Sequence, residues 1–142
     1  MLTLAEVKET FEFLDDWEDR YRYIIDLGKA LPDMSQDLRV EENLVKGCQS
    51  LVWIVLSYDQ SANRVTIQLD SDAFIVRGLI AIMMTVFQHQ SPDRIVAADV
   101  EELFSELDLI SHLSPTRGNG LRSMVGRIKH EAQLLLDHRA IA

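Results

Sequence analysis

The chain has 142 residues, of which 47% are hydrophobic and 26% are charged, so we expect a single domain over residues 1–142 with a sizeable core. Its 14 Lys and Arg against 23 Asp and Glu give a formal net charge of -9. Such a surface repels phosphate backbones, which excludes nucleic acid as an expected partner and favours a protein with a basic face. The sole cysteine, Cys48, excludes an internal disulfide, a CxxC redox pair and a cysteine-based zinc or iron–sulfur site.

Nothing in the sequence indicates export or membrane insertion. The stretch after Met1 is interrupted by charged residues and lacks the pattern of a cleavable signal. The longest apolar run, Leu79 to Phe87, is much shorter than the roughly 20 residues that span a bilayer. We therefore expect a cytoplasmic protein without a membrane partner.

Two helices are predicted at the start of the chain. Thr3 followed by Glu6 forms a capping-box pattern, which predicts a helix from Leu4 to Leu14. Apolar residues at helical spacing from Trp17 to Leu31 predict a second, amphipathic helix that ends before proline. The polar stretch Pro32 to Asn43 has no clear period and is predicted to be a loop.

The centre of the chain has the pattern of a small sheet. Leu51 to Tyr58 is apolar on both faces, whereas Arg64 to Asp70 alternates, and turn residues separate the two runs. They predict an antiparallel hairpin. We expect a third short strand at Leu44 to Lys46, which would place Gly47 and Cys48 at a turn between strands.

Helices are predicted for the rest of the chain. Asp72 is the expected N-cap of an apolar helix from Ala73 to Phe87, and Asp99 begins a short helix. Ser114 with proline has the pattern of another helix start, and Gly118–Gly120 is predicted to be a tight turn before the last helix. The predicted architecture is α+β, a small antiparallel three-stranded sheet covered by helices.

Cys48 is the residue that could carry covalent chemistry. A lone cysteine is more often a small buried hydrophobe than a nucleophile, but this one is predicted at a turn, beside a glycine that lets another molecule approach. A thiol hydrolase would also need a histidine base, and His112 is the one candidate because it precedes a turn that could fold toward the sheet. The remaining histidines are expected to be surface residues: His89, His130 and His138.

Four segments resemble the SufE family, which includes CsdE. They are WEDRYRYIIDLGKALP (17–32), NLVKGCQSLVWIV (43–55), SDAFIVRGLIAI (71–82) and LISHLSPTRGNGLRSMV (109–125). The motifs GCQSxVW and HLSPTRxxGL are the specific ones, and they occur in the expected order over nearly the whole chain. The family fold is similar to that of the IscU scaffold, but IscU proteins use three cysteines, so the cysteine count excludes a scaffold role here.

The resemblance implies a sulfur acceptor in iron–sulfur cluster assembly. Cys48, in GCQS, would receive persulfide sulfur from a pyridoxal-phosphate cysteine desulfurase of the SufS or CsdA type, stimulate that enzyme, and deliver the sulfur to a scaffold such as SufBCD. The cofactor would belong to the partner, and this chain would need none. A regulator that binds a desulfurase without carrying sulfur is the main alternative.

Four further residues are expected to support Cys48. Gly47 and Gln49 flank it in the motif, and His112 and Arg117 come from the second motif. A positive charge near a thiol favours the thiolate, and Arg117 is the candidate for that charge, with a structural salt bridge as its alternative role.

Overall fold

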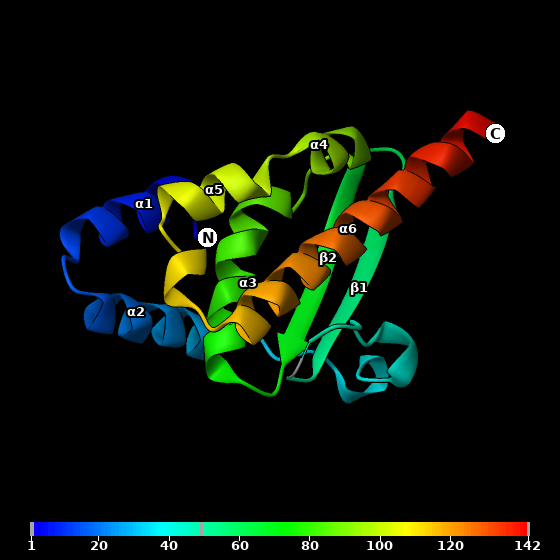
Figure 1. Cartoon of the computed structure of the whole chain (residues 1–142). Helices are drawn as coiled ribbons and strands as arrows, with labels where there is room; N and C mark the ends of the chain where they lie inside the picture. The colour runs from blue at the N-terminus through cyan, green and yellow to red at the C-terminus, as the bar shows by residue number, and fades with distance from the viewer. Residues whose placement is uncertain (1, 49, 142) are drawn as a thin grey trace.

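The computed structural model describes residues 2–48 and 50–141. It is a mixed α+β fold in which a two-stranded antiparallel sheet packs against helices (Figure 1). The elements in chain order are α1 (Leu4–Phe13), α2 (Trp17–Ala30), β1 (Val52–Asp59), β2 (Arg64–Ser71), α3 (Phe74–Phe87), α4 (Pro92–Ala97), α5 (Val100–Glu106) and α6 (Pro115–Ile141).

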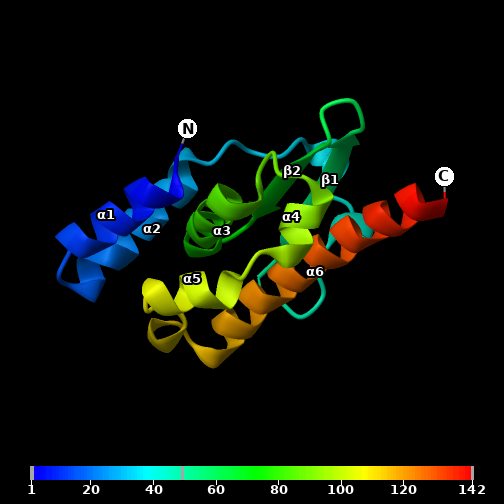
Figure 2. The same cartoon turned by 90° about the horizontal axis from the view of Figure 1, so that it is seen from above.

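Helix α3 is the centre of the packing. It lies between the α1–α2 pair on one side and α4, α5 and α6 on the other, and it also contacts β2 (Figure 2). Most of its residues are buried, including Leu79, Ile80 and Met83, as expected for a helix that is apolar almost all round. The hairpin pairs in register from Val52 with Ser71 to Asp59 with Arg64.

The expected third strand is replaced by a single bridge. Leu44 forms an isolated antiparallel bridge with Trp53, and the Val45 N–H donates to the Val52 carbonyl at 2.9 Å. The chain then turns at once, because Gly47 adopts a positive φ of 88°. Among the described residues the sheet therefore has two strands, and the segment before Cys48 only touches its edge.

The N-cap predicted for α1 is confirmed, whereas the one predicted for α3 is wrong. Thr3 and Asp16 accept hydrogen bonds from amides in the first turns of α1 and α2. At α3 the N-cap position falls on Ala73, which provides no side-chain cap. The carboxylate of Asp72 instead accepts from the N–H of Leu51 at 3.1 Å, which ties the loop after Cys48 to the end of β2.

The predicted glycine turn lies inside α6. The hydroxyl of Ser114 accepts from the N–H of Arg117 at 3.2 Å, and the N–H of Gly118 bonds to the Ser114 carbonyl at 2.9 Å. The Ser–Pro start favours the helix from its first turn, and α6 runs through both glycines although each costs about 1 kcal/mol of helix stability. The predicted tight turn at Gly118–Gly120 is wrong. Because glycine has no side chain, other groups can approach the backbone of α6 closely at these positions.

Two glycines let α2 and α3 approach through their backbones. A Cβ atom added to Gly78 would overlap the carbonyl oxygen of Ile24, and one added to Gly28 would overlap the carbonyl oxygen of Phe74. No side chain larger than hydrogen fits at either position without separating the helices. This contact fixes α2 against the start of α3.

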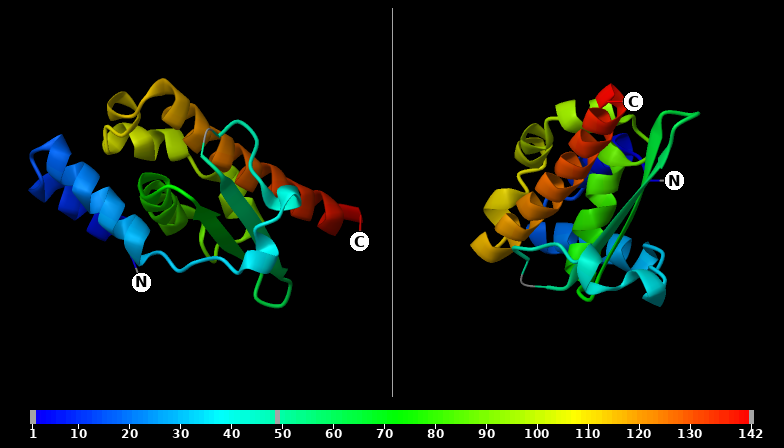
Figure 3. Two further views of the ribbon diagram at one scale, coloured as in Figure 1. Left: turned by 90° about the horizontal axis from the view of Figure 1, so that it is seen from below. Right: turned by 90° about the vertical axis from the view of Figure 1, so that its right-hand side faces the viewer.

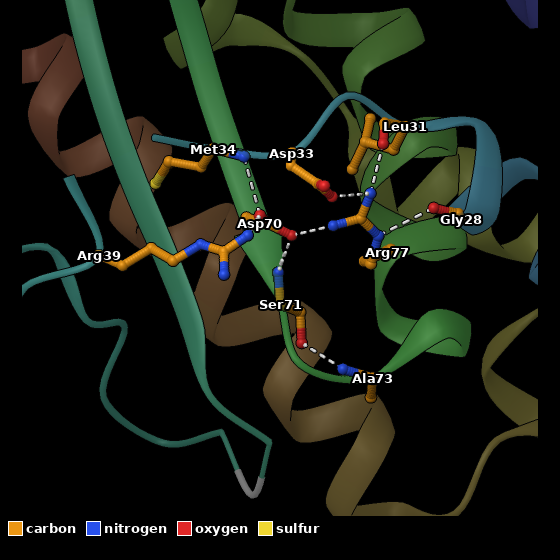
Figure 4. Close-up of polar contacts among 9 residues, drawn as sticks. All are labelled: Gly28, Leu31, Asp33, Met34, Arg39, Asp70, Ser71, Ala73 and Arg77. Atoms are coloured by element: carbon orange, nitrogen blue, oxygen red, sulfur yellow. Dashed lines mark hydrogen bonds and ion pairs between the residues drawn. The ribbon is translucent and has the colours of Figure 1, made fainter. Parts of the chain in front are cut away.

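A buried carboxylate joins β2 to the connection after α2 (Figure 4). Asp70 is fully buried and accepts from the N–H groups of Met34 at 2.9 Å and Ser71 at 2.7 Å, from Arg39 at 2.6 Å, and from Arg77. Burial alone raises the pKa of Asp70. The hydrogen bonds and the Arg77 charge outweigh burial, so the pKa lies below its usual value.

Arg77 extends this cluster to the end of α2. Its guanidinium donates to the carbonyl of Gly28 at 2.9 Å and to that of Leu31, and it pairs with Asp33 at 3.1 Å. The buried cluster therefore holds α2, α3 and β2 in one arrangement.

Replacing Asp70 with Asn should lower the free energy of unfolding by about 3–5 kcal/mol near neutral pH, because Arg77 then stays buried with only the exposed Asp33 as an ion-pair partner. Since the pKa of Asp70 is lowered by folding, its contribution is complete above the ordinary Asp pKa and is lost as the pH falls through the folded pKa. The difference in unfolding free energy between Asp70→Asn and the wild type should become smaller as the pH falls. Denaturant titrations across an acid pH series would measure this difference. The exposed Asp37→Asn is the control, with a change below about 0.5 kcal/mol. Equal losses in both variants, or a constant gap, would contradict this role.

Candidate functional site

Cys48 lies on a sharp turn between the edge bridge and β1. Gly47 needs its glycine for two reasons: its φ is positive, and an added Cβ would lie 2.7 Å from the hydroxyl of Ser123 on α6. The predicted turn is present at Lys46 and Gly47, immediately before Cys48, although it follows a single bridge and not a strand. Gln49, the other flanking residue named from the motif, lies outside the described residues.

The thiol of Cys48 faces α6 and is half-buried. Its Sγ–H donates to the carbonyl of Gly120 at 3.4 Å, and a Cβ on Gly120 would lie 3.5 Å from the sulfur. A cavity of about 20 Å³ adjoins the thiol, which is room for about one water-sized atom. Its apolar wall comprises Val52, Val76, Leu79, Leu121 and Met124.

The enclosure alters the acidity of the thiol. Burial raises the pKa of Cys48, because the thiolate would lose solvation beside an apolar wall. At neutral pH the resting group is therefore the thiol, and its proton is held by the Gly120 carbonyl. Burial therefore lowers the fraction of the nucleophilic thiolate at neutral pH.

Arg117 is brought to Cys48 as the sequence suggested. It lies on the first turn of α6 and lines the same cavity, together with Thr116. No carboxylate lies within ion-pair distance of its guanidinium among the described side chains, so the alternative salt-bridge role has no partner there. Arg117 thus lines the thiol cavity without an acidic partner among the described side chains.

His112 is not beside the thiol. Its ring stacks on Trp17 with centroids 4.0 Å apart and planes 11° apart, and its carbonyl accepts from the hydroxyl of Tyr21. It does not line the cavity of Cys48. The arrangement therefore provides no histidine base for a hydrolytic cysteine, because the ring is held in an aromatic contact with α2.

Sequence reasoning missed a hollow next to the thiol cavity. This hollow measures about 440 Å³, and Arg117 lines both it and the cavity of Cys48. Its other lining residues are Tyr21, Ile25, Ile75, His112, Leu113 and Ser114. They come from α2, α3 and the segment just before α6, so no local pattern could have grouped them.

Gly120 and Asp72 were also missed as partners of the Cys48 loop. Gly120 is the glycine of the motif HLSPTRxxGL, and that motif was the one available signal for its proximity to the thiol. Asp72 was assigned to a helix cap because its spacing from α3 allowed it.

In the described part of the chain, no helix has the length and apolar character to cross a membrane.

Comparisons with known proteins cover nearly the whole chain. A family model described as "SufE: Fe-S metabolism associated domain" matches residues 5–132. An uncharacterized SufE-like protein of Rhizobium etli is 48% identical over 136 residues, which is 94% of this chain and 92% of that protein. Another from Rhizobium meliloti is 47% identical over 135 residues, 94% of this chain and 96% of that protein.

A solved structure supports the fold. The solution structure of a hypothetical protein from Thermus thermophilus superimposes with a TM-score of 0.67 and covers 96% of this chain and 99% of that one. Its sequence identity is 17%, so this similarity concerns the fold alone. The family match, in contrast, includes both Cys48 and Arg117.

Proposed function

Since the chain belongs to the SufE family, whose domain is associated with Fe–S metabolism, we propose that it is a sulfur acceptor that loads Cys48 from the persulfide of a cysteine desulfurase. The observation that carries the proposal is the site of Cys48, a thiol on a turn beside a cavity for one more atom. A carrier needs such a site, because it must hold one sulfane sulfur and later give it up. Its setting in this proposal is the cytoplasm, where a lone thiol stays reduced.

The transfer balances without an external oxidant or reductant. The Cys48 thiol first loses its proton, and the thiolate attacks the outer sulfur of the donor Cys–S–SH. The donor sulfur–sulfur bond breaks, and the inner donor cysteine leaves as a thiolate that takes up the released proton. Cys48 then carries the sulfane sulfur as a persulfide. The pyridoxal phosphate that releases sulfur from free cysteine belongs to the desulfurase in this proposal.

The cavity supports storage of the product. Its apolar wall and small size would limit the access of small thiols, which would otherwise remove the sulfane sulfur. With one cysteine in the chain there is no resolving thiol to release the sulfur as an internal disulfide. The loaded protein would then stimulate the desulfurase by clearing its product and would pass the sulfur to a scaffold such as SufBCD.

Mass spectrometry tests the proposal. The protein is mixed with a cysteine desulfurase and free cysteine, and peptide mapping should find the added mass of one sulfur atom on Cys48. Stimulation of the desulfurase without added mass would instead indicate a regulator. If the protein neither gains sulfur nor stimulates the desulfurase, both functions are rejected.

Arg117→Ala should slow the loading of Cys48 about tenfold near neutral pH, because removing the guanidinium further disfavours the thiolate. Raising the pH should restore much of the loading rate, since Cys48 then loses its proton more readily without the guanidinium. Initial rates of persulfide formation across a pH series measure this. Arg64→Ala, which removes an exposed cation at the hairpin turn, is the control and should load normally. A defect of equal size at every pH would reject the electrostatic role.

A further inference from the structure

Two large apolar side chains are exposed beside the Cys48 loop. Leu51 is 48% exposed and Phe74 is 55% exposed. They lie near each other because the N–H of Leu51 bonds to Asp72, two residues before Phe74. Figure 3, left, views this end of the molecule, where the connection into β1, the start of α3 and the first turns of α6 come together.

The apolar strip continues into the hollow described above. Ile75 follows Phe74 in α3 and lines the hollow together with Tyr21 and Ile25 of α2. Arg117 forms the common wall between the hollow and the thiol cavity. A segment seated along this strip would therefore reach the mouth of the Cys48 cavity.

Three cations border this strip although the chain has a net charge of -9, and the exposed carboxylate of Asp72 also lies on it. The ammonium of Lys29 lies 5.9 Å from the centroid of the Phe74 ring, Lys46 stands two residues before Cys48, and Arg117 lines the cavity. None of these three cations contacts a carboxylate among the described side chains. Several cations elsewhere are paired, namely Lys8 with Glu106 at 2.6 Å, Arg122 with Glu101 at 2.7 Å and Arg127 with Glu131 at 2.7 Å.

We propose that this surface, the mouth patch, docks an apolar segment flanked by carboxylates on the donor desulfurase. The mouth patch comprises Leu51, Phe74, Ile75, Lys29, Lys46 and Arg117. The inference rests on the proposed function and deepens it, because it specifies the chemistry of the donor surface that meets the thiol.

The two parts of the mouth patch do different work in binding. The exposed apolar side chains supply affinity when they are desolvated against a partner, and the cations around them steer acidic groups toward the patch. The acidic remainder of the surface repels the same groups. A partner segment with carboxylates is thus directed to the one face where Cys48 can react with it.

Phe74→Asp tests the apolar part. It should raise the desulfurase concentration needed for half-maximal loading of Cys48 by at least about tenfold, because an anchor is lost and a repulsive charge is added. Leu134→Asp is the matched control, since Leu134 is 52% exposed on α6 away from the patch, and it should leave that concentration unchanged. The loading rate at saturating desulfurase should be similar in both variants and the wild type, which separates docking from chemistry. Equal half-maximal concentrations for Phe74→Asp and the wild type would overturn the proposal.

Lys29→Glu tests the charge part, with Arg64→Glu as the matched exposed control. Lys29→Glu should weaken desulfurase binding about threefold to tenfold at low salt, and the loss should shrink as salt screens the charges. Tighter binding of Lys29→Glu would show that the docked segment is basic and would overturn the charge assignment. Sedimentation of the free protein is run alongside, and a dimer that Phe74→Asp dissociates would overturn the proposal by assigning the patch to a second copy of the chain.

A comparison of the wild type with the patch variants separates the acceptor function from the docking at the mouth patch. If wild-type protein gains no sulfur, the acceptor function fails, whatever the patch variants do. If wild-type protein is loaded and the patch variants load with the same concentration dependence, the function stands and the mouth patch is rejected.

Discussion

Cys48→Ser is expected to abolish sulfur loading while leaving the fold and the desulfurase complex intact. Serine differs from cysteine by one atom of similar size, and the site is only half-buried, so packing changes little. A serine hydroxyl is protonated near neutral pH and forms no persulfide, so the attack on the donor sulfur has no nucleophile. Peptide mass spectrometry after incubation with desulfurase and cysteine should show no added sulfur at position 48.

The control for this variant is binding. Titration with the desulfurase should give an affinity within about threefold of the wild type, because the mouth patch is unchanged. A Cys48→Ser protein that still gains sulfur from cysteine would falsify the carrier mechanism. A protein that loses both loading and binding would show that the thiol itself holds the complex together, contrary to the mouth patch.

Gly78→Ala is expected to cause a large loss of stability. The added methyl group would overlap the carbonyl of Ile24, which belongs to the backbone of α2 and cannot rotate away. The helices must separate, which opens the contact at the neighbouring glycine, Gly28, as well. We expect a loss of about 3 kcal/mol or more, the upper part of the range for overpacked cores. Thermal or denaturant unfolding would measure it.

Gly126→Ala is the matched control on the same chain. It makes the same exchange on exposed α6, where an added Cβ meets nothing within 4 Å. Alanine is the better helix former, so stability should rise by up to about 1 kcal/mol. If stability falls for Gly78→Ala and rises for Gly126→Ala, the loss at position 78 results from the helix contact. A loss at both positions would point to a general intolerance of glycine replacement.

The parts of the fold that local patterns determine were predictable. The capped start of α1 at Thr3, the hairpin of β1 and β2, and the turn at Gly47 all follow from residues within a few positions of one another. The third strand was not predictable in the same way. Leu44 has the composition of a strand residue, but whether the segment extends is decided by the turn at Gly47 and its contact with α6.

The site was predictable in its chemistry and not in its surroundings. Cys48 and Arg117 stand in recognisable motifs, and they line one cavity although they are far apart in the sequence. His112 was a reasonable candidate for the same neighbourhood, yet stacking on Trp17 holds it elsewhere. The local excess of positive charge was likewise hidden by the overall composition, because Lys29, Lys46 and Arg117 come from three separate segments: α2, the loop before β1 and α6.

The hydrogen bond from Cys48 to Gly120 depends on the proton of Sγ. In the proposed carrier, Sγ joined to a second sulfur has no hydrogen left to donate, so loading removes this donor from the Gly120 carbonyl. The loop before Cys48 remains tied to α6, because the guanidinium of Arg127 donates to the carbonyl of Leu44 at 3.1 Å. The filled and empty carriers would then differ at the Gly120 carbonyl, beside the stored sulfur, without any second cysteine.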